Sequence, residues 1–220
     1  MAARAAPAHE EGAREEAREA GGEEAVVGHP RTTRMTEIVM PPSRTRINEE
    51  NELLRRLQER FRKAAEYVAQ RFAADRRVAR IVLFGSVAGP LGHEIPRFAE
   101  FRRAGIELLH ECRDVDLAVW LDAPFDLRVL RGARAQALLD LHRETGIGVA
   151  HHQVDVFLFD AASDCYLGRL CNFNCCPKGK PECAAPGCGA APFLRQIEGF
   201  RLKPEALAPD KSIVLYERGA

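Results

Sequence analysis

Three short motifs, each inside or beside a stretch expected to form a β-strand, constrain the fold of this chain most strongly. They are Leu83-Phe84-Gly85-Ser86, Asp114-Val115-Asp116-Leu117 and Val154-Asp155-Val156. The apolar run 81–84 predicts a buried strand that ends in a Gly-Ser turn and leads into helix-forming sequence. The other two motifs lie in the strand-like runs 114–120 and 153–159. Strands separated by helical segments predict an α/β fold with a mixed sheet.

The acidic residues of these motifs are candidate metal ligands. Because side chains on a strand alternate, Asp114 and Asp116 point to the same face, about 7 Å apart along the backbone. If the third strand neighbours the second, Asp155 lies about 5 Å to the side. Three such oxygen ligands suit Mg²⁺. Taken singly, the acidic motif also fits a solvated strand edge and the Gly-Ser pair fits an ordinary turn, but the order of all three favours a catalytic site.

Over about residues 75–160 the chain resembles the nucleotidyltransferase superfamily that includes DNA polymerase beta, and especially its minimal bacterial domains. That family carries an apolar residue, Gly, Ser, a spacer, Asp-apolar-Asp-apolar, and a third acid on a later strand. The resemblance implies that Gly85 and Ser86 hold the triphosphate. It also implies that Asp114, Asp116 and Asp155 bind Mg²⁺ or Mn²⁺, and that an NTP, with ATP favoured, is the donor.

Elementary chemistry agrees with this function. Backbone N–H groups at a Gly-rich turn that opens a helix cradle phosphate oxygens, and the Ser86 hydroxyl can donate a further hydrogen bond. Two metal ions stabilise the attacking and leaving oxygens of an in-line displacement. Asp155 is the candidate that takes the proton of the acceptor hydroxyl. The predicted reaction is therefore transfer of a nucleoside monophosphate to a hydroxyl, with release of pyrophosphate.

The spacer between Ser86 and Asp114 is longer than the minimal family usually has. The added stretch 89–112 predicts a loop followed by a helix around Phe98 to Leu109. This insertion bears on the acceptor pocket more than on the chemistry.

Composition narrows the setting of the chain. Its 220 residues fit one compact domain with appendages, and a net charge of +0 gives no overall attraction to nucleic acid or anionic membranes. No apolar run reaches the roughly 20 residues that a membrane span needs, so no membrane partner is expected. Residues 1–34 match neither a signal nor a transit peptide, and we expect a disordered extension over 1–45 and a cytoplasmic location.

Further helices follow from apolar periodicity. A helix over 48–74 is expected to bury one stripe, consisting of Leu53, Leu57, Phe61, Ala64, Val68 and Phe72. A second helix, over 126–145, is expected to bury Leu127, Leu130, Ala137, Leu138 and Leu141 and to end near Gly146. A short helix over 193–200 and a last strand over 212–216 complete the expected elements.

Six of the seven cysteines fall between residues 165 and 188. Without a secretory signal, this density among Pro, Gly and Lys turns favours a metal knuckle over disulfides. The preferred ligands of a structural Zn²⁺ are Cys171, Cys176, Cys183 and Cys188. Cys175 is an alternative to Cys176, Cys165 is a possible outlier, and an iron–sulfur cluster is the second choice.

The predicted organisation is a nucleotidyltransferase core over 46–164, the knuckle over 165–190, and a C-terminal helix and strand over 191–220 that complete the domain. A second function from another class is an antitoxin-like regulatory module of the same fold that acts with a helical partner protein. A third, a nucleic-acid-binding zinc protein, is disfavoured by the neutral charge and the few aromatic residues near Lys178 and Lys180.

Overall fold

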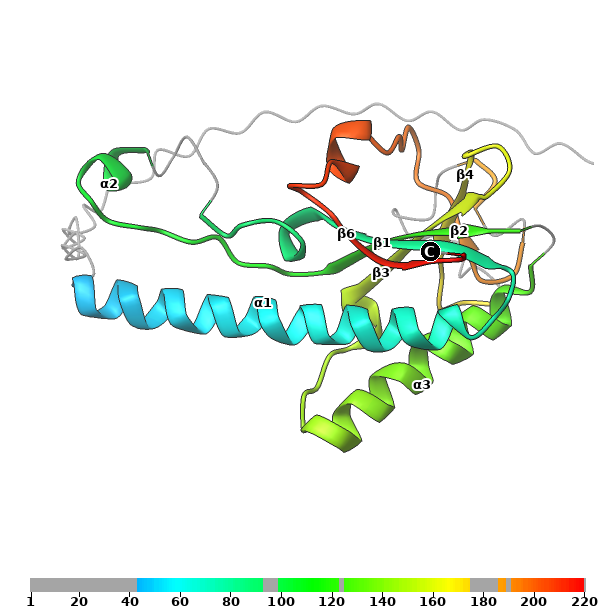
Figure 1. The fold of residues 1–220 in the computed structure, drawn as a ribbon, viewed down its shortest axis with the longest axis horizontal. Coiled ribbons are helices and arrows are strands. Elements are labelled where there is room, and N and C mark those ends of the chain that lie inside the picture. The colour runs from blue at the N-terminus through cyan, green and yellow to red at the C-terminus, as the bar shows by residue number, and fades with distance from the viewer. Residues whose placement is uncertain (1–42, 93–98, 123–124, 175–185, 189–190, 220) are drawn as a thin grey trace, which may run out of the picture. The chain divides into compact units, whose positions relative to one another are not determined.

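The strands expected at the three motifs all form, and they lie in one six-stranded sheet (Figure 1). The computed structural model describes residues 43–92, 99–122, 125–174, 186–188 and 191–219. The strands are β1 (Val78–Phe84), β2 (Val115–Leu121), β3 (Val154–Asp160), β4 (Tyr166–Leu170), β5 (Leu194–Arg195) and β6 (Ile213–Glu217), in the order β5-β4-β3-β2-β1-β6. Only β2 and β3 pair in parallel among these strands. The expected α/β class with a mixed sheet is confirmed.

The described part of the chain contains three α-helices: α1 (Arg44–Ala73), α2 (Ala99–Arg103) and α3 (Leu127–Thr145). The side chains of Ser43 and Asp126 accept hydrogen bonds from the first turns of α1 and α3 and so fix where these helices begin. Gly146, with φ of 74°, ends α3 as the periodicity predicted. Helix α1 begins at Arg44, next to the boundary expected at residue 45. Residues 1–42 lie outside the described ones.

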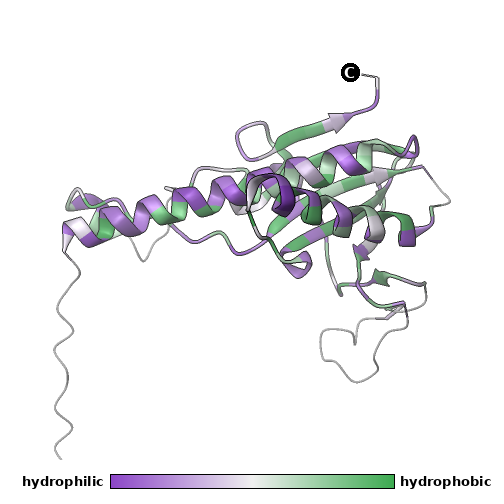
Figure 2. Cartoon of the chain, turned by 90° about the horizontal axis from the view of Figure 1, so that it is seen from below, coloured by the Kyte–Doolittle hydropathy of each residue, from purple (hydrophilic) through white to green (hydrophobic). Residues whose placement is uncertain are grey.

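Side-chain alternation gives the sheet two different faces. On one face, residues such as Leu83, Leu117 and Val156 are buried beneath α1 and α3, which lie on the same side of the sheet (Figure 1). On the other face, aromatic residues such as Phe84 and Phe157 are covered by the segment 197–207. Figure 2 shows that the central strands are mostly hydrophobic, whereas α1 alternates between hydrophilic and hydrophobic residues.

The buried stripe of α1 differs from the expected one in its N-terminal half. Leu53 is 64% exposed, whereas Asn51 and Gln58 are buried. The reason is that this half of the helix packs against irregular backbone, which needs polar partners. Asn51 donates from Nδ2 to the carbonyl of Glu107 at 2.7 Å and accepts from the N–H of Leu109 at 3.2 Å. From Phe61 onward the expected apolar stripe is confirmed.

Two expected helices are wrong in whole or in part. Among the described residues of the insertion, only those of α2 are helical, and the segment 106–114 runs as irregular chain against α1. The expected helix over 193–200 is absent, and its first residues form β5. Its apolar residues Ile197 and Phe200 cover the aromatic face of the sheet instead. β4 also extends the sheet past residue 164, where the core was expected to end. No helix among the described residues is long and apolar enough to span a membrane.

Candidate functional site

Asp116 and Asp155 lie side by side at one end of the sheet. They are register partners in the parallel pair of β2 and β3, so they occupy adjacent positions on the same face. Both side chains are partly buried. Asp114 lies one residue before β2 begins and is exposed. The strand placement therefore brings the second and third acids together and leaves the first at the rim.

The Gly-Ser turn lies directly against this carboxylate pair. β1 ends at Phe84, whose register partner is Asp116, and the chain then turns through a short 3₁₀ helix, Gly85–Val87. Gly85 has a φ of 76°, and an ideal Cβ placed on it would lie 2.6 Å from Oδ2 of Asp116. Glycine is needed here for its backbone conformation and for the close approach.

Helix α1 holds the turn from the other side. Gln58 donates from Nε2 to the carbonyls of Ser86 at 3.1 Å and Gly89 at 2.7 Å. Arg62 donates from Nε to the carbonyl of Val87 at 2.9 Å. The buried Cys112 thiol adds a hydrogen bond to the Ser86 carbonyl at 3.3 Å. These contacts occupy the carbonyl side of the turn, and in a helical turn the N–H groups point the opposite way.

A hollow of about 860 Å³ opens beside the turn. Gly85 and Ser86 line it together with Phe84, Gly89, Pro90, His110, Ala206, Asp210 and Lys211. Its far wall comes from the 3₁₀ helix Pro204–Leu207 and the residues that follow it, and Lys211 supplies a positive charge. The hollow thus joins the turn to a lysine more than 120 positions later in the chain, which no local motif could indicate.

The electrostatics of the pair are those of crowded carboxylates. The pKa of Asp116 is raised to about 7, first by burial and then by the neighbouring charges of Asp155 and Asp114, against the effect of Arg169. Burial also raises the pKa of Asp155, and Arg169 acts in the opposite direction. Two carboxylates that are difficult to ionise together form a site that gains from a cation.

In the structure that cation is a side chain. Arg169, on β4, forms an ion pair with Asp155 from Nη1 to Oδ2. Among the described residues, no three His, Cys, Asp or Glu side chains stand close enough to hold a metal ion. Asp116 and Asp155 therefore form an acidic pair beside an arginine, and Asp114 does not join them as a third ligand of a metal site.

A second arginine, Arg134, lies beneath the pair. It is 3% exposed, and burial lowers its pKa to about 10. Its guanidinium donates to the carbonyl of Val154 at 3.0 Å and to Oδ1 of Asn172. Arg134 thus connects the first residue of β3 to Asn172, within the cysteine-rich stretch 165–188. Sequence reasoning missed it because it occupies an apolar-stripe position of α3, where a charge is unexpected.

Only two of the four preferred zinc ligands lie among the described residues. Cys175, Cys176 and Cys183 lie outside the described residues. Cys171 and Cys188 are half-buried, and the described cysteines form no disulfide. The sulfur of Cys171 accepts a hydrogen bond from the N–H of Phe173 at 3.5 Å, a contact of the kind that orients metal ligands.

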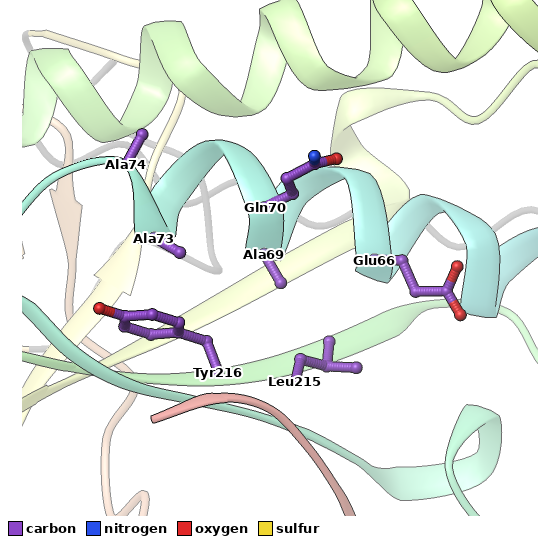
Figure 3. A pocket seen from close by; sticks show the side chains of 7 residues that line it. All are labelled: Glu66, Ala69, Gln70, Ala73, Ala74, Leu215 and Tyr216. Atoms are coloured by element: carbon purple, nitrogen blue, oxygen red, sulfur yellow. The ribbon is translucent and has the colours of Figure 1, made fainter. Parts of the chain in front are cut away.

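Another hollow, of about 460 Å³, lies between α1 and β6 (Figure 3). Small side chains of α1, such as Ala69 and Ala73, face Leu215 and Tyr216 of β6 there. Its one acidic residue, Glu66, has no basic or metal-ligating neighbour in the lining. By contrast, the lining of the hollow beside Gly85 includes Ser86, His110 and Lys211.

Comparison with protein-family models, with curated proteins and with solved structures gave no match. The function is therefore inferred from the site itself.

Proposed function

We propose that this protein is a nucleotidyltransferase that transfers a nucleoside monophosphate from an NTP, ATP for preference, to a hydroxyl acceptor. The observation that carries the proposal is the contact of the Gly85 turn with Asp116, which is itself the register partner of Asp155. A phosphate cradle and a carboxylate pair in contact are the two parts that such a transfer requires. In this proposal the sheet is a nucleotidyltransferase fold and the cysteine cluster is an added zinc knuckle.

The donor would lie in the hollow beside the turn. The carbonyls of Ser86, Val87 and Gly89 are engaged by α1, which leaves the N–H side of the turn for phosphate oxygens. Lys211 lines the same hollow and can neutralise phosphate charge. The volume of about 860 Å³ is large enough for a nucleotide.

The donor set suits a hard divalent cation. Asp116 and Asp155 offer adjacent carboxylate oxygens, and Asp114 is close enough for its charge to act on both. When bound, Mg²⁺ or Mn²⁺ would supply charge neutralisation for the phosphates and the attacking oxygen. For the metal ion to bind here, Arg169 would have to release Asp155, and the side chain of Asp114 would have to turn toward Asp116 and Asp155.

The protein's own residues then have separate roles. The turn at Gly85 and Ser86 orients the triphosphate, and Asp155 accepts the proton of the acceptor hydroxyl. The acceptor oxygen forms a bond to the α-phosphorus while the bond from that phosphorus to the bridging oxygen breaks. Pyrophosphate leaves with the electron pair of that bond.

The test is transfer of label from α-labelled NTPs, with Mg²⁺ or Mn²⁺, alone and with cell extract. Asp116→Asn should abolish transfer because it removes the central carboxylate charge. Asp122→Asn, a change at an acid just beyond the opposite end of β2, is the matched control and should retain most of the transfer. Wild-type turnover in both Asp114→Asn and Asp116→Asn would overturn the assignment.

A second candidate function is favoured by the ion pair of Arg169 with Asp155. A module in which this arginine permanently satisfies Asp155 needs no metal and could act by binding, as an antitoxin-like partner of a helical protein. In that case Arg169→Gln would leave partner binding intact, and no NTP would be consumed by the wild-type protein.

A further inference from the structure

The sheet has an open edge at β6, which is the last strand in the order β5-β4-β3-β2-β1-β6. One side of β6 pairs with β1. Among the residues that the structure describes, no strand pairs with its other side. The backbone N–H and C=O groups of such an edge can pair with a strand of another molecule, and native edges are usually protected by charges, prolines or bulges. The residues of β6 therefore decide what this edge can bind.

The exposed side of β6 is apolar. Residues 213–216 contain no charge and no proline, and Ile213 and Val214 are 36% and 50% exposed. Of the usual protections, β6 has a β-bulge, where its pairing with β1 passes over Leu215. Leu215 and Tyr216 face the small side chains of α1 in the hollow of about 460 Å³ (Figure 3). The edge thus presents apolar side chains of high strand propensity and continues into an apolar hollow.

Opposite charges bound this apolar stretch. Lys211 precedes it and Glu217 ends it, and both residues are exposed. Glu217 keeps 51% of its side chain exposed beside Arg80, with 3.8 Å between the carboxylate oxygen and Nε. Two copies of β6 that run antiparallel bring each lysine toward the glutamate of the other copy, whereas parallel copies bring like charges together. The edge is therefore complementary to itself across a two-fold axis.

The neighbouring charges select one alignment of the two copies. When Lys211 is opposite Glu217, Asp210 is opposite Arg218, again with opposite signs. A shift by one residue in one direction brings Lys211 opposite Arg218. A shift in the other direction brings Asp210 opposite Glu217, so either shift opposes like charges. Arg218 is already paired with Asp122 at 2.6 Å, and the lysine and glutamate therefore contribute most to the selection.

We propose that β6 is the interface of a homodimer, in which β6 of a second copy pairs antiparallel with it. Val214 is the midpoint of the selected alignment and lies on the two-fold axis, opposite Val214 of the second copy. The two sheets then continue into one another by strand addition. Lys211 also lines the hollow beside Gly85. Its ammonium group has three donors, so a contact with a carboxylate leaves donors for a phosphate.

Sedimentation equilibrium of the full-length protein tests this proposal. A reducing agent is present throughout, because the chain has seven cysteines that could cross-link copies. We expect a monomer–dimer equilibrium with a Kd on the order of 10 μM, since the apolar stretch is short. A protein that stays monomeric at about 100 μM would overturn the proposal and leave the edge to a different partner.

A lysine at the two-fold axis tests the location of the interface. Val214→Lys should raise the Kd at least about tenfold, because two ammonium groups would meet at the axis. Val129→Lys is the matched control, since this valine on α3 is 46% exposed and distant from β6 in the sequence. It should keep the wild-type Kd. Because both valines are exposed, both variants should fold, and circular dichroism checks this.

An exchange of charges tests the alignment. Lys211→Glu and Glu217→Lys should each weaken the dimer severalfold, because each brings like charges together across the axis. The double variant restores opposite charges and should return the Kd toward the wild-type value. The ion pair with Arg80 is lost in both Glu217→Lys and the double variant, so it cannot explain a rescue. A double variant without rescue, or a dimer that Val214→Lys leaves intact, would contradict the proposal.

Discussion

An ideal Cβ atom on Gly85 would lie 2.6 Å from Oδ2 of Asp116. This separation is shorter than any ordinary van der Waals contact. The turn can therefore approach the carboxylate this closely only because residue 85 has no side chain. The register of β1 and β2, in which Phe84 is opposite Asp116, fixes that approach. The Gly85 turn and the acidic pair are thus parts of one strand end.

Gly85→Ala should therefore destabilise the protein and damage nucleotide binding. The added methyl group meets Asp116, and alanine is strained at a φ of 76°. We expect a loss of about 2–4 kcal/mol in the free energy of unfolding. Urea denaturation measures the stability, and titration with an ATP analogue measures the binding.

Gly132→Ala is the matched control for that change. An added Cβ at this exposed position in α3 has no heavy atom within 4 Å. Alanine should stabilise the helix by about 0.5–1 kcal/mol, so the same substitution has opposite signs at the two positions. Equal effects at both sites would contradict the close approach of Gly85 to Asp116.

Asp116→Asn should stabilise the metal-free protein at alkaline pH while it removes activity. In the folded protein the pKa of Asp116 is raised to about 7 from an ordinary value of 3.8. The folded state therefore holds this proton more tightly than the unfolded state does, and stability falls as pH rises from about 4 to 7. Asparagine has no carboxyl group to titrate, so the variant loses this dependence of stability on pH.

The expected gain at pH 8 is on the order of 1–3 kcal/mol, allowing for partial solvation of the site. Denaturation at pH 5 and pH 8, with EDTA present, measures it. Asp122→Asn is the control, because its ion pair with Arg218 lowers the pKa of that exposed carboxyl instead. A wild-type protein with equal stability at both pH values would argue against a raised pKa at Asp116.

Much of this site could be predicted because its parts are local in sequence. A strand followed by Gly-Ser and a strand carrying alternating acids each fix their own geometry, so β1, β2 and β3 form where they were expected. The parallel register that pairs Asp116 with Asp155 was expected only on condition that the two strands are neighbours. The sheet order satisfies that condition.

The remainder depends on contacts between distant residues. Lys211 reaches the hollow from near the C-terminus, and Arg169 meets Asp155 because β4 pairs with β3. The expected helix over 193–200 fails because its apolar residues are needed over the aromatic face of the sheet. Leu53 is exposed for a related reason, since the neighbouring backbone requires Asn51 as a partner.

Gln58→Met should weaken donor binding through the turn. The methionine keeps the volume but leaves the carbonyls of Ser86 and Gly89 without their donor. We expect about tenfold weaker binding of the ATP analogue, because the cradle loses its fixed position. Gln136→Met, at an exposed glutamine that bonds only to Asp140 within α3, is the control. Unchanged affinity in Gln58→Met would exclude a positioning role for this residue.

Arg134→Met should destabilise the protein from beneath the site. It removes the donor to the carbonyl of Val154 and to Asn172, leaving buried acceptors unsatisfied. The expected cost is about 1–3 kcal/mol, since the loss of these bonds is partly offset by the removal of a buried charge. Arg128→Met, at an exposed position of the same helix, should change stability by less than about 0.5 kcal/mol. Thermal denaturation of both variants measures the difference.

The cysteine-rich segment should carry about one zinc ion per chain, bound by thiolates at roughly 2.3 Å. Cys188→Ser should release that metal, because Cys188 belongs to the preferred quartet, and the segment has few apolar residues to hold it otherwise. Cys165→Ser, at an exposed cysteine outside the quartet, should retain it. Elemental analysis and X-ray absorption measure the content and the distance. Iron in place of zinc would indicate a cluster, and purified protein without metal would reject the knuckle.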